Sequence, residues 1–164
     1  MKFSSQEEFG LRCLLRLGIR FEEQGSALTI PEIARLEGIS VPYVGKLLRV
    51  LRTAGLITSA RGAAGGYVLA RPPERIAVGE ALAVLGGRLY EPSFCATHAG
   101  DERVCTHSVN CSLRSLWRSL QLVLDQVLDK TSLKDLLCNE SEMTNWIDHL
   151  VTVSLITPAA AVKQ

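Results

Sequence analysis

Two short helical segments separated by a glycine, with a glycine-rich hairpin directly after them, constrain the fold of this chain most. The first segment begins at a capping box, Thr29-Ile-Pro-Glu32, and Gly38 stops it. The second begins at Ser40, has Pro42 in its first turn and ends at Gly55. Two helices joined by so short a turn are typical of a helix-turn-helix.

Two strand-like runs follow at once. They cover Leu56–Ala60 and Gly66–Ala70, and the small-residue segment Arg61-Gly-Ala-Ala-Gly65 separates them. This pattern predicts a β-hairpin with a glycine-bearing loop. A helix-turn-helix followed directly by such a hairpin is a winged helix, so we predict a mainly α fold with a two-stranded β-wing.

One further helix is predicted on each side of this unit. A capping box at Ser4 and Glu7 begins an N-terminal helix that we expect to end near Gln24. After the wing, a short helix over Val78–Leu85 ends at a pair of glycines, Gly86 and Gly87.

A long helix with a coiled-coil-like seam is predicted in the C-terminal half, and we expect it to mediate dimerisation. Its apolar residues recur at spacings of four and three: Leu113, Trp117, Leu120, Leu124 and Val127. A short helix over Leu133–Leu137 follows it. Beyond Cys138 one more amphipathic helix is possible around Trp146, Ile147 and Leu150.

The chain of 164 residues fits one domain with an oligomerisation arm. We expect a DNA-binding domain at 1–86, a cysteine-containing loop at 87–112 and the dimerisation helix with its short successor at 113–137. The C-terminal extension at 138–164 is expected to be partly helical or disordered.

Charge is distributed unevenly although the net charge is only +1. Residues 1–90 carry 12 basic and 8 acidic side chains, whereas residues 91–164 carry 6 and 9. Between residues 41 and 75, six basic residues accompany one acidic residue, Glu74. Such a local excess of positive charge indicates a nucleic-acid-binding face.

The candidate DNA contacts lie on the second helix of the helix-turn-helix and on the wing. Burial of the apolar face of this second helix exposes its opposite face, which carries Pro42, Tyr43, Lys46, Arg49 and Arg52. In the wing, Arg61 stands beside a loop whose glycines, Gly62, Gly65 and Gly66, let the backbone approach a surface closely. A basic helix face alone is commonly just solvated, but its combination with a basic wing favours DNA.

Three cysteines, Cys95, Cys105 and Cys111, lie together in a stretch without helical or strand pattern. Thiolates bind soft metals, but the spacing C-x9-C-x5-C lacks the close pairs of a zinc knuckle. Cys13 falls on the apolar face of the first helix and is predicted to belong to the core, and Cys138 receives no role.

We expect a cytoplasmic protein without a membrane segment. The N-terminus lacks the apolar stretch of a signal peptide, and no apolar run approaches membrane-spanning length. Five cysteines, an odd number, fit reduced thiols or a metal better than a disulfide framework.

The sequence resembles the IscR/NsrR/RirA superfamily of bacterial transcription regulators over about residues 1–137. The most specific match is the wing, Arg61-Gly-Ala-Ala-Gly-Gly-Tyr-Val-Leu-Ala-Arg71. The recognition-helix region from Ile39 to Leu48, the segment Ile76-Ala-Val-Gly-Glu-Ala and Cys111-x5-Trp117 are similar to family motifs as well.

The resemblance implies a homodimer that binds palindromic double-stranded operators and holds an iron–sulfur cluster, either 4Fe–4S or 2Fe–2S. Members of this kind sense iron, redox state or nitric oxide. Cys95, Cys105 and Cys111 align with the thiolate ligands, and Pro42 and Lys46, with Arg61, align with operator contacts. Some members carry a base-contacting glutamate where this chain has Gly45, a difference that affects the operator sequence.

The resemblance also bears on the fourth cluster ligand. Some members use a histidine three residues after the last cysteine, but Arg114 stands there and a guanidinium cannot ligate a metal. Glu8 matches the acidic N-terminal residue that completes the site from the partner subunit in other members, while Glu7 is explained by its capping box. His107 and His98 are the reserve candidates.

We therefore predict a transcription regulator, specifically a repressor, whose operator affinity depends on an iron–sulfur cluster. The alternative is a regulator of the same fold that senses through cysteine thiols or zinc alone. An enzyme is not expected, because the sequence contains neither a nucleotide-binding loop nor a nucleophilic catalytic constellation.

Overall fold

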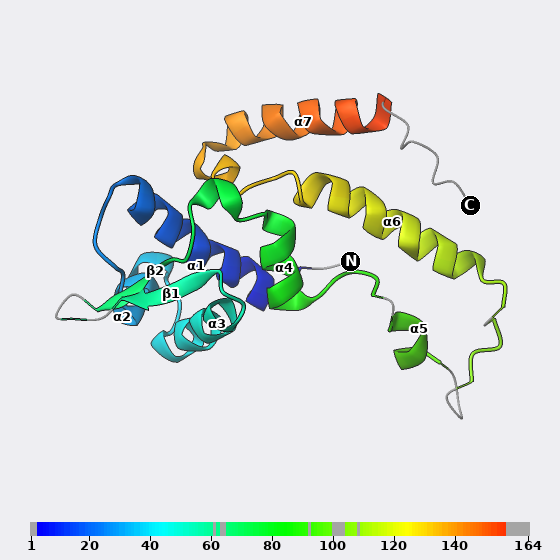
Figure 1. The fold of residues 1–164 in the computed structure, drawn as a ribbon, viewed down its shortest axis with the longest axis horizontal. Helices are drawn as coiled ribbons and strands as arrows, with labels where there is room; N and C mark the ends of the chain where they lie inside the picture. Colours follow the sequence, from blue (N-terminus) through cyan, green and yellow to red (C-terminus); the bar gives the residue numbers. More distant parts are fainter. Residues whose placement is uncertain are drawn as a thin grey trace.

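The structure is a computed structural model of the chain, and it describes residues 3–60, 62, 65–91, 93–99, 104–107 and 109–156. Figure 1 shows an N-terminal unit of helices with one small two-stranded sheet, beside which the two long C-terminal helices extend. The predicted mainly α fold with a β-wing is confirmed.

Helix α1 (Ser5–Glu22) begins at the predicted capping box. The Ser4 hydroxyl accepts a hydrogen bond from the Glu7 N–H at 3.3 Å, and the Glu7 carboxylate accepts one from the Ser4 N–H at 2.7 Å. The helix ends shortly before the expected point, because Gln24 turns the chain with a left-handed φ of 51°. Its buried residues are Gly10, Cys13, Leu14, Leu17 and Gly18.

Helices α2 (Ile30–Glu37) and α3 (Val41–Thr53) form the helix-turn-helix. The second capping box is present between Thr29 and Glu32, and Gly38 ends α2 with a φ of 66°. Ser40 precedes α3 as expected, but its hydroxyl makes no capping hydrogen bond. The Tyr43 and Val44 N–H groups donate to the Ser40 carbonyl, at 3.1 Å and 3.0 Å.

The inner face of α3 is buried as its spacing predicts. Val44, Leu47, Leu48 and Leu51 are all fully buried, and they pack with α1 into one hydrophobic core. This burial fixes the opposite face of α3 toward solvent.

The wing consists of β1 (Ile57–Ala60) and β2 (Gly66–Leu69), one residue shorter at one end of each than expected. The strands pair antiparallel, with Ile57 opposite Leu69. Leu28, in the segment before α2, pairs in turn with Tyr67 through an isolated bridge. A Cβ at Gly66 would lie 2.6 Å from the Leu28 carbonyl oxygen, so this close approach requires glycine.

A 3-10 turn, η1 (Pro73–Arg75), leads from the wing into α4 (Val78–Gly86). This helix packs against α1 and α3, and Gly87 follows it with a φ of 83°. The predicted end of the helix at the glycine pair is therefore confirmed.

The cysteine-containing stretch was expected to lack regular structure, and this expectation is wrong at one place. A short helix, α5 (Phe94–Thr97), includes Cys95. The Tyr90, Phe94 and His98 rings follow one another at intervals of four residues. Their centroids are 5.3 Å and 4.0 Å apart along this series, so ring contacts support the turn.

The C-terminal part contains α6 (Ser112–Leu128), the 3-10 turn η3 (Asp135–Leu137) and α7 (Glu140–Ile156). The long helix and the additional helix were both expected, whereas the predicted helix at 133–137 is only a 3-10 turn. Leu133 is buried beside α1 and contributes to the core. Figure 1 shows α7 following η3 and running back along α6, which it contacts.

The close approach at Gly66 gives a stability test. We expect Gly66→Ala to lower the free energy of unfolding by about 1–3 kcal/mol, because the added methyl group meets a backbone carbonyl that cannot move independently. Gly45→Ala is the matched control. Its Cβ would lie 3.8 Å from the Ile30 Cδ1, so the change should stabilise α3 by about 1 kcal/mol. Urea unfolding measures both values, and equal effects of the two substitutions would contradict the described wing packing.

Candidate functional site

The outer face of α3 carries unpaired positive charge. Pro42, Lys46, Arg49 and Arg52 are exposed. Within the part of the chain that the structure describes, none of the three cations forms an ion pair. These side chains are therefore available to phosphate groups or base edges.

Tyr43 differs from its neighbours on this face because it is half-buried. Its ring packs edge-on against Phe9 of α1, with centroids 6.1 Å apart and planes at 88°. The Arg12 guanidinium lies 5.3 Å from the Phe9 ring centroid on another side. Tyr43 therefore joins the first turn of α3 to α1.

The tip of the wing is only partly described. Arg61, the predicted wing contact, lies outside the described residues. Gly62 is exposed and has a φ of 112°, and its carbonyl accepts a hydrogen bond from the Gly65 N–H at 2.9 Å. Arg71, at the base of the wing, is paired with Glu80 of α4 and therefore belongs to the domain's internal contacts.

A buried carboxylate connects α1 with α2. Glu37, whose side chain is only 6% exposed, accepts a hydrogen bond from the Arg12 Nε at 2.7 Å and is also paired with Arg16. Arg12 additionally donates to the Glu37 carbonyl at 2.9 Å. This contact was not predicted from the sequence, although Glu37 stands four residues after the buried Ile33, on the apolar face of α2.

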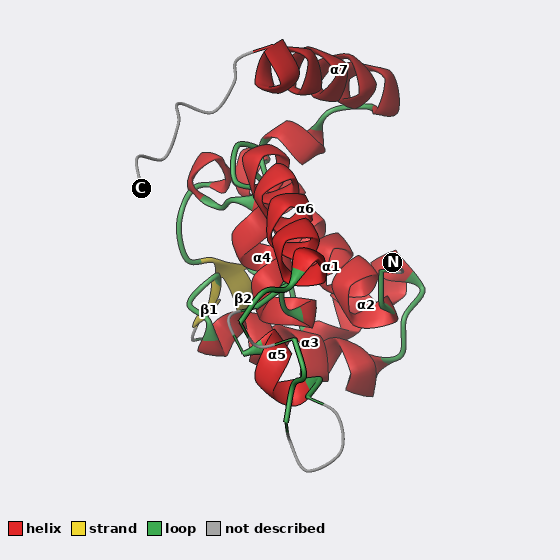
Figure 2. Cartoon of the chain, turned by 90° about the vertical axis from the view of Figure 1, so that its right-hand side faces the viewer, coloured by secondary structure: helices red, strands yellow, loops and turns green. Residues whose placement is uncertain are grey.

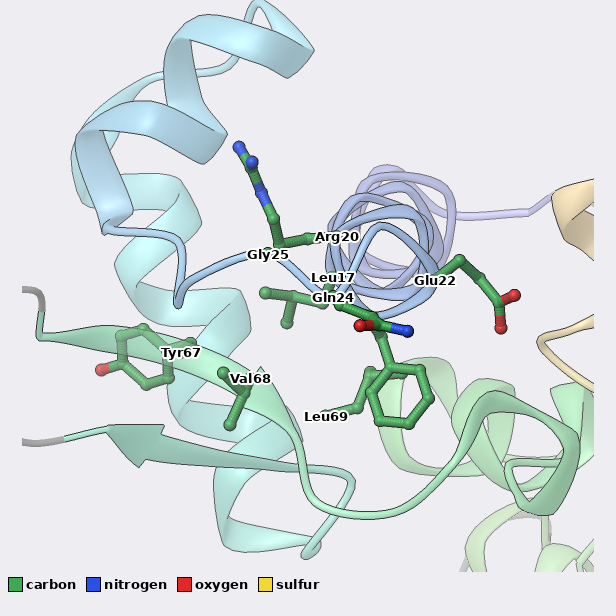
Figure 3. Close-up of a pocket in the computed structure, with 9 residues that line it drawn as sticks. Leu17, Arg20, Glu22, Gln24, Gly25, Tyr67, Val68 and Leu69 are labelled. Carbon is green, nitrogen blue, oxygen red and sulfur yellow. The ribbon is translucent and has the colours of Figure 1, made fainter.

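A hollow of about 550 Å³ lies between the end of α1 and the wing strand β2 (Figure 3). Leu17, Arg20 and Gln24 line it from the helix side, and Tyr67 and Leu69 line it from the strand. Figure 3 shows Arg20 and Glu22 pointing in different directions from α1. No cysteine or histidine lines the hollow, so it is separate from the cysteine segment.

Cys95 lies half-buried on α5, next to an aromatic side chain. Its Sγ is 3.8 Å from the hydroxyl oxygen of Tyr90. Desolvation, together with this hydrogen bond and the adjacent thiol, raises the pKa of Tyr90 above its ordinary value. The tyrosine therefore stays a neutral hydroxyl beside the thiol at physiological pH.

Cys111 lies directly before α6 and caps that helix. Its Sγ accepts a hydrogen bond from the Arg114 N–H at 3.4 Å. The Arg114 guanidinium donates to the His107 carbonyl at 3.2 Å. Arg114 is therefore a structural partner of the cysteine segment, consistent with its inability to ligate a metal.

The three cysteines of this segment are all free and half-buried, but the described residues do not bring them together. Among those residues there is no group of three or more histidine, cysteine, aspartate or glutamate side chains close enough to hold one metal ion. The residues between Cys95 and Cys105 that set their separation include 100–103, which lie outside the described part.

The candidate fourth ligands are all accessible. Glu8 is exposed on the first turn of α1 and takes no part in the capping box, which Ser4 and Glu7 form. His98 is exposed, stacks on Phe94 and places its Nδ1 3.0 Å from the Phe94 carbonyl oxygen. His107 is exposed as well.

The remaining cysteines lie elsewhere. Cys13 is fully buried, as predicted, and burial raises the pKa of its thiol to about 12. Cys138 is exposed at the end of η3, and its Sγ lies 2.8 Å from the Asp135 carbonyl oxygen. Both are free thiols.

The donor set of the segment fits an iron–sulfur cluster in its chemistry. Three reduced, half-buried thiols stand in one stretch between α4 and α6, and none is consumed in a disulfide. Two of the thiols already lie beside hydrogen-bond donors, Tyr90 and the Arg114 N–H. Hydrogen bonds to sulfur are among the features that adjust such sites.

No helix in the described part of the chain is both long and apolar enough to span a bilayer.

Comparison with known proteins places this geometry in a family. Residues 3–139 match the Rrf2 family, described as an iron-dependent transcriptional regulator. Protein rrf2 of Nitratidesulfovibrio vulgaris is 36% identical over 141 residues, which cover 86% of this chain and 90% of that protein. The transcriptional regulator CymR of Bacillus subtilis is 34% identical over 83% of this chain and 89% of its own length.

Solved structures agree with this assignment. The structure of CymR, the global cysteine regulator of B. subtilis, has a TM-score of 0.65 and 32% identity, over 84% of this chain and 96% of that chain. IscR of T. potens has the same TM-score and 33% identity, over 84% of this chain and 86% of that chain.

The resemblance inferred from the wing and recognition-helix motifs is thereby confirmed. The relatives are named as transcriptional regulators, which are not enzymes. The chain belongs to the Rrf2 family and is a DNA-binding, winged-helix transcription regulator.

Proposed function

We propose that this regulator is a repressor whose operator affinity is controlled by an iron–sulfur cluster held by Cys95, Cys105 and Cys111, with the partner subunit's Glu8 as fourth ligand. One observation carries the proposal: three free thiols occupy a single segment that joins the winged-helix unit to α6. The cluster, when bound, would supply a redox-active centre sensitive to iron supply, oxidants or nitric oxide. Such a protein would act in the cytoplasm, where thiols stay reduced.

Residues of this chain would transmit a change at the cysteines to the DNA-binding face. Glu8 directly precedes Phe9, which packs on Tyr43 of α3. Gln6, two residues earlier, donates to the Leu85 carbonyl of α4. The first turns of α1 therefore touch both the recognition helix α3 and α4, the helix that leads to the cysteine segment. Binding or release of Glu8 by the cluster would therefore change the relative positions of α3 and α4.

A dimer with two recognition helices fits the exposed apolar face of α6. Leu113 and Leu120 of the predicted seam lie on this face with Leu116 and Val123, and these four side chains are 40–58% exposed. The other three residues of the predicted seam are half-buried: Trp117, Leu124 and Val127. In a symmetric pair this face would pack against its own copy, and a palindromic operator would match the two-fold symmetry. The division at 1–86, 87–112, 113–137 and 138–164 follows these roles, with no role assigned to the last part.

A second candidate is a regulator of the same fold that responds through its thiols or zinc without a cluster. Two observations favour it: the described residues do not bring the cysteines together, and a relative of similar identity is named as a cysteine regulator. Metal analysis separates the two candidates.

The DNA-binding face can be tested with an operator selected from random-sequence duplexes. We expect Lys46→Ala and Arg49→Ala each to weaken binding about tenfold and to reduce the salt dependence by about one released counterion, because each loses a cation facing DNA. Lys130→Ala, an exposed lysine just after α6, is the control and should bind normally. Gel-shift titrations at two salt concentrations measure these effects. Unchanged binding by both α3 variants would place the DNA contacts elsewhere.

Colour and metal content test the cluster. Anaerobically isolated protein should be brown and contain iron and sulfide. Glu8→Ala should change the visible spectrum and speed cluster loss about tenfold. This is the lower end of the loss in metal affinity that follows mutation of residues around a metal site. Its circular dichroism should stay native, since Glu8 is exposed, and Glu140→Ala should retain the native spectrum. A colourless, zinc-loaded protein would instead support the second candidate.

The dimer face of α6 can be tested separately. Leu116→Glu and Leu120→Glu should raise the dimer dissociation constant at least about 100-fold, because each places a charge where an exposed leucine would become buried in the proposed interface. Light scattering across a concentration series measures the change. Val109→Glu, at a side chain 97% exposed, is the control and should remain dimeric. Dimers of unchanged affinity in both leucine variants would exclude this face.

A further inference from the structure

A second hollow, which the proposed function does not use, lies between the segment after α4 and one side of α6. Its volume is about 580 Å³. Arg88 and Tyr90 line it from the segment, and Arg114, Arg118 and Gln121 line it from α6. The Tyr90 N–H donates to the Gln121 Oε1 at 2.9 Å, so the two walls are joined directly. In Figures 1 and 2 the segment leading from α4 to α5 runs beside α6.

Positive charge predominates around this hollow. Three guanidinium groups and one carboxylate, Asp125, line it. Asp125 is already engaged, because Arg88 pairs with it and the Gln121 Nε2 donates to it at 2.7 Å. The Arg118 guanidinium forms no hydrogen bond or ion pair with the described residues. The residues that line the hollow therefore carry a net positive charge.

The shape of the hollow restricts what could neutralise this charge. A volume of this size lies in the range of small-molecule pockets and exceeds that of a simple ion. The Tyr90 ring and Leu122 supply apolar wall, while guanidinium groups bind carboxylates and phosphates through paired hydrogen bonds. An organic molecule with an anionic group fits both properties.

The hollow is also connected to the cysteine segment by direct contacts. Tyr90 reaches the Cys95 Sγ with its hydroxyl, and Arg114 donates to the Cys111 Sγ through its N–H and to the His107 carbonyl through its guanidinium. A ligand held by these residues would stabilise the positions of two of the three cysteines.

We propose that this arginine-lined hollow is a binding site for a small organic anion, a carboxylate or phosphate ester with an apolar body, and that its occupancy stabilises the positions of Cys95 and Cys111. The proposal stands apart from the cluster, because it requires only the described residues of one chain. The anion and the cysteines would then give the regulator two inputs at adjacent places.

Titration calorimetry with phenyl phosphate tests the site on the full-length, metal-free protein. Phenyl phosphate should bind at one site per chain and more tightly than either inorganic phosphate or phenol, since each lacks one of the two recognised parts. Arg118→Gln should weaken binding at least about tenfold, because a charged hydrogen-bonding partner is lost, and Arg118→Lys should fall between the two. Arg75→Gln, an exposed arginine on η1, is the matched control and should bind as the native protein does.

A second measurement connects the site with the cysteines. Phenyl phosphate should slow alkylation of Cys95 and Cys111 but leave the rate at the exposed Cys138 unchanged. Absence of binding, equal binding by Arg118→Gln and the native protein, or equal affinity for inorganic phosphate would each overturn the proposal. None of these results affects the cluster test, which is read from iron content and colour.

Discussion

The packing of α1 against the other elements of the winged-helix unit is the constraint on which the rest of the structure depends. Leu14 and Leu17 are buried in the common core, and α1 contacts α2, α3, α4, β2 and η3. Gly10 permits this density, because a Cβ there would lie 2.4 Å from the Leu85 Cδ2 of α4. Helix α1 therefore positions both the recognition helix α3 and α4, which leads to the cysteine segment. For this reason the proposed cluster ligand Glu8, on the first turn of α1, would influence DNA binding.

Elements determined by local chemistry were predictable from the sequence. Reciprocal caps at Ser4 and Thr29 and apolar spacing in α3 and α6 depend on residues a few positions apart, so their patterns are visible in the chain. Helix α5 was not predictable, because it is only one turn long and is accompanied by ring contacts from Tyr90 to His98. The missing side-chain cap at Ser40 was not predictable either, because Thr29 forms one although α2 has a proline, Pro31, at the same position as Pro42 in α3.

The candidate site likewise contains residues that the sequence predicts and contacts that it does not. The cysteines were recognisable as donors from their type alone, and the cations of α3 from their helical face. Contacts between distant segments were not recognisable: Glu37 meets Arg12 across 25 positions, and Gln121 meets Tyr90 across 31. The arginine-lined hollow belongs to this second kind, since Arg88 and Arg118 come from different elements. Separation along the chain, more than the chemistry of the side chains, therefore decides which contacts the sequence predicts.

The bridge between Leu28 and Tyr67 has a consequence for how operators are distinguished. Two hydrogen bonds, 3.1 Å and 2.8 Å long, fasten the wing to the residue just before the Thr29 cap of α2. The wing cannot swing away from the helix-turn-helix without breaking both bonds, so the two parts of the winged helix move as one unit. In the proposed dimer, regulation would leave base preference within a half-site intact and act on the distance and angle between the two winged-helix units, so operators would be selected by their half-site spacing.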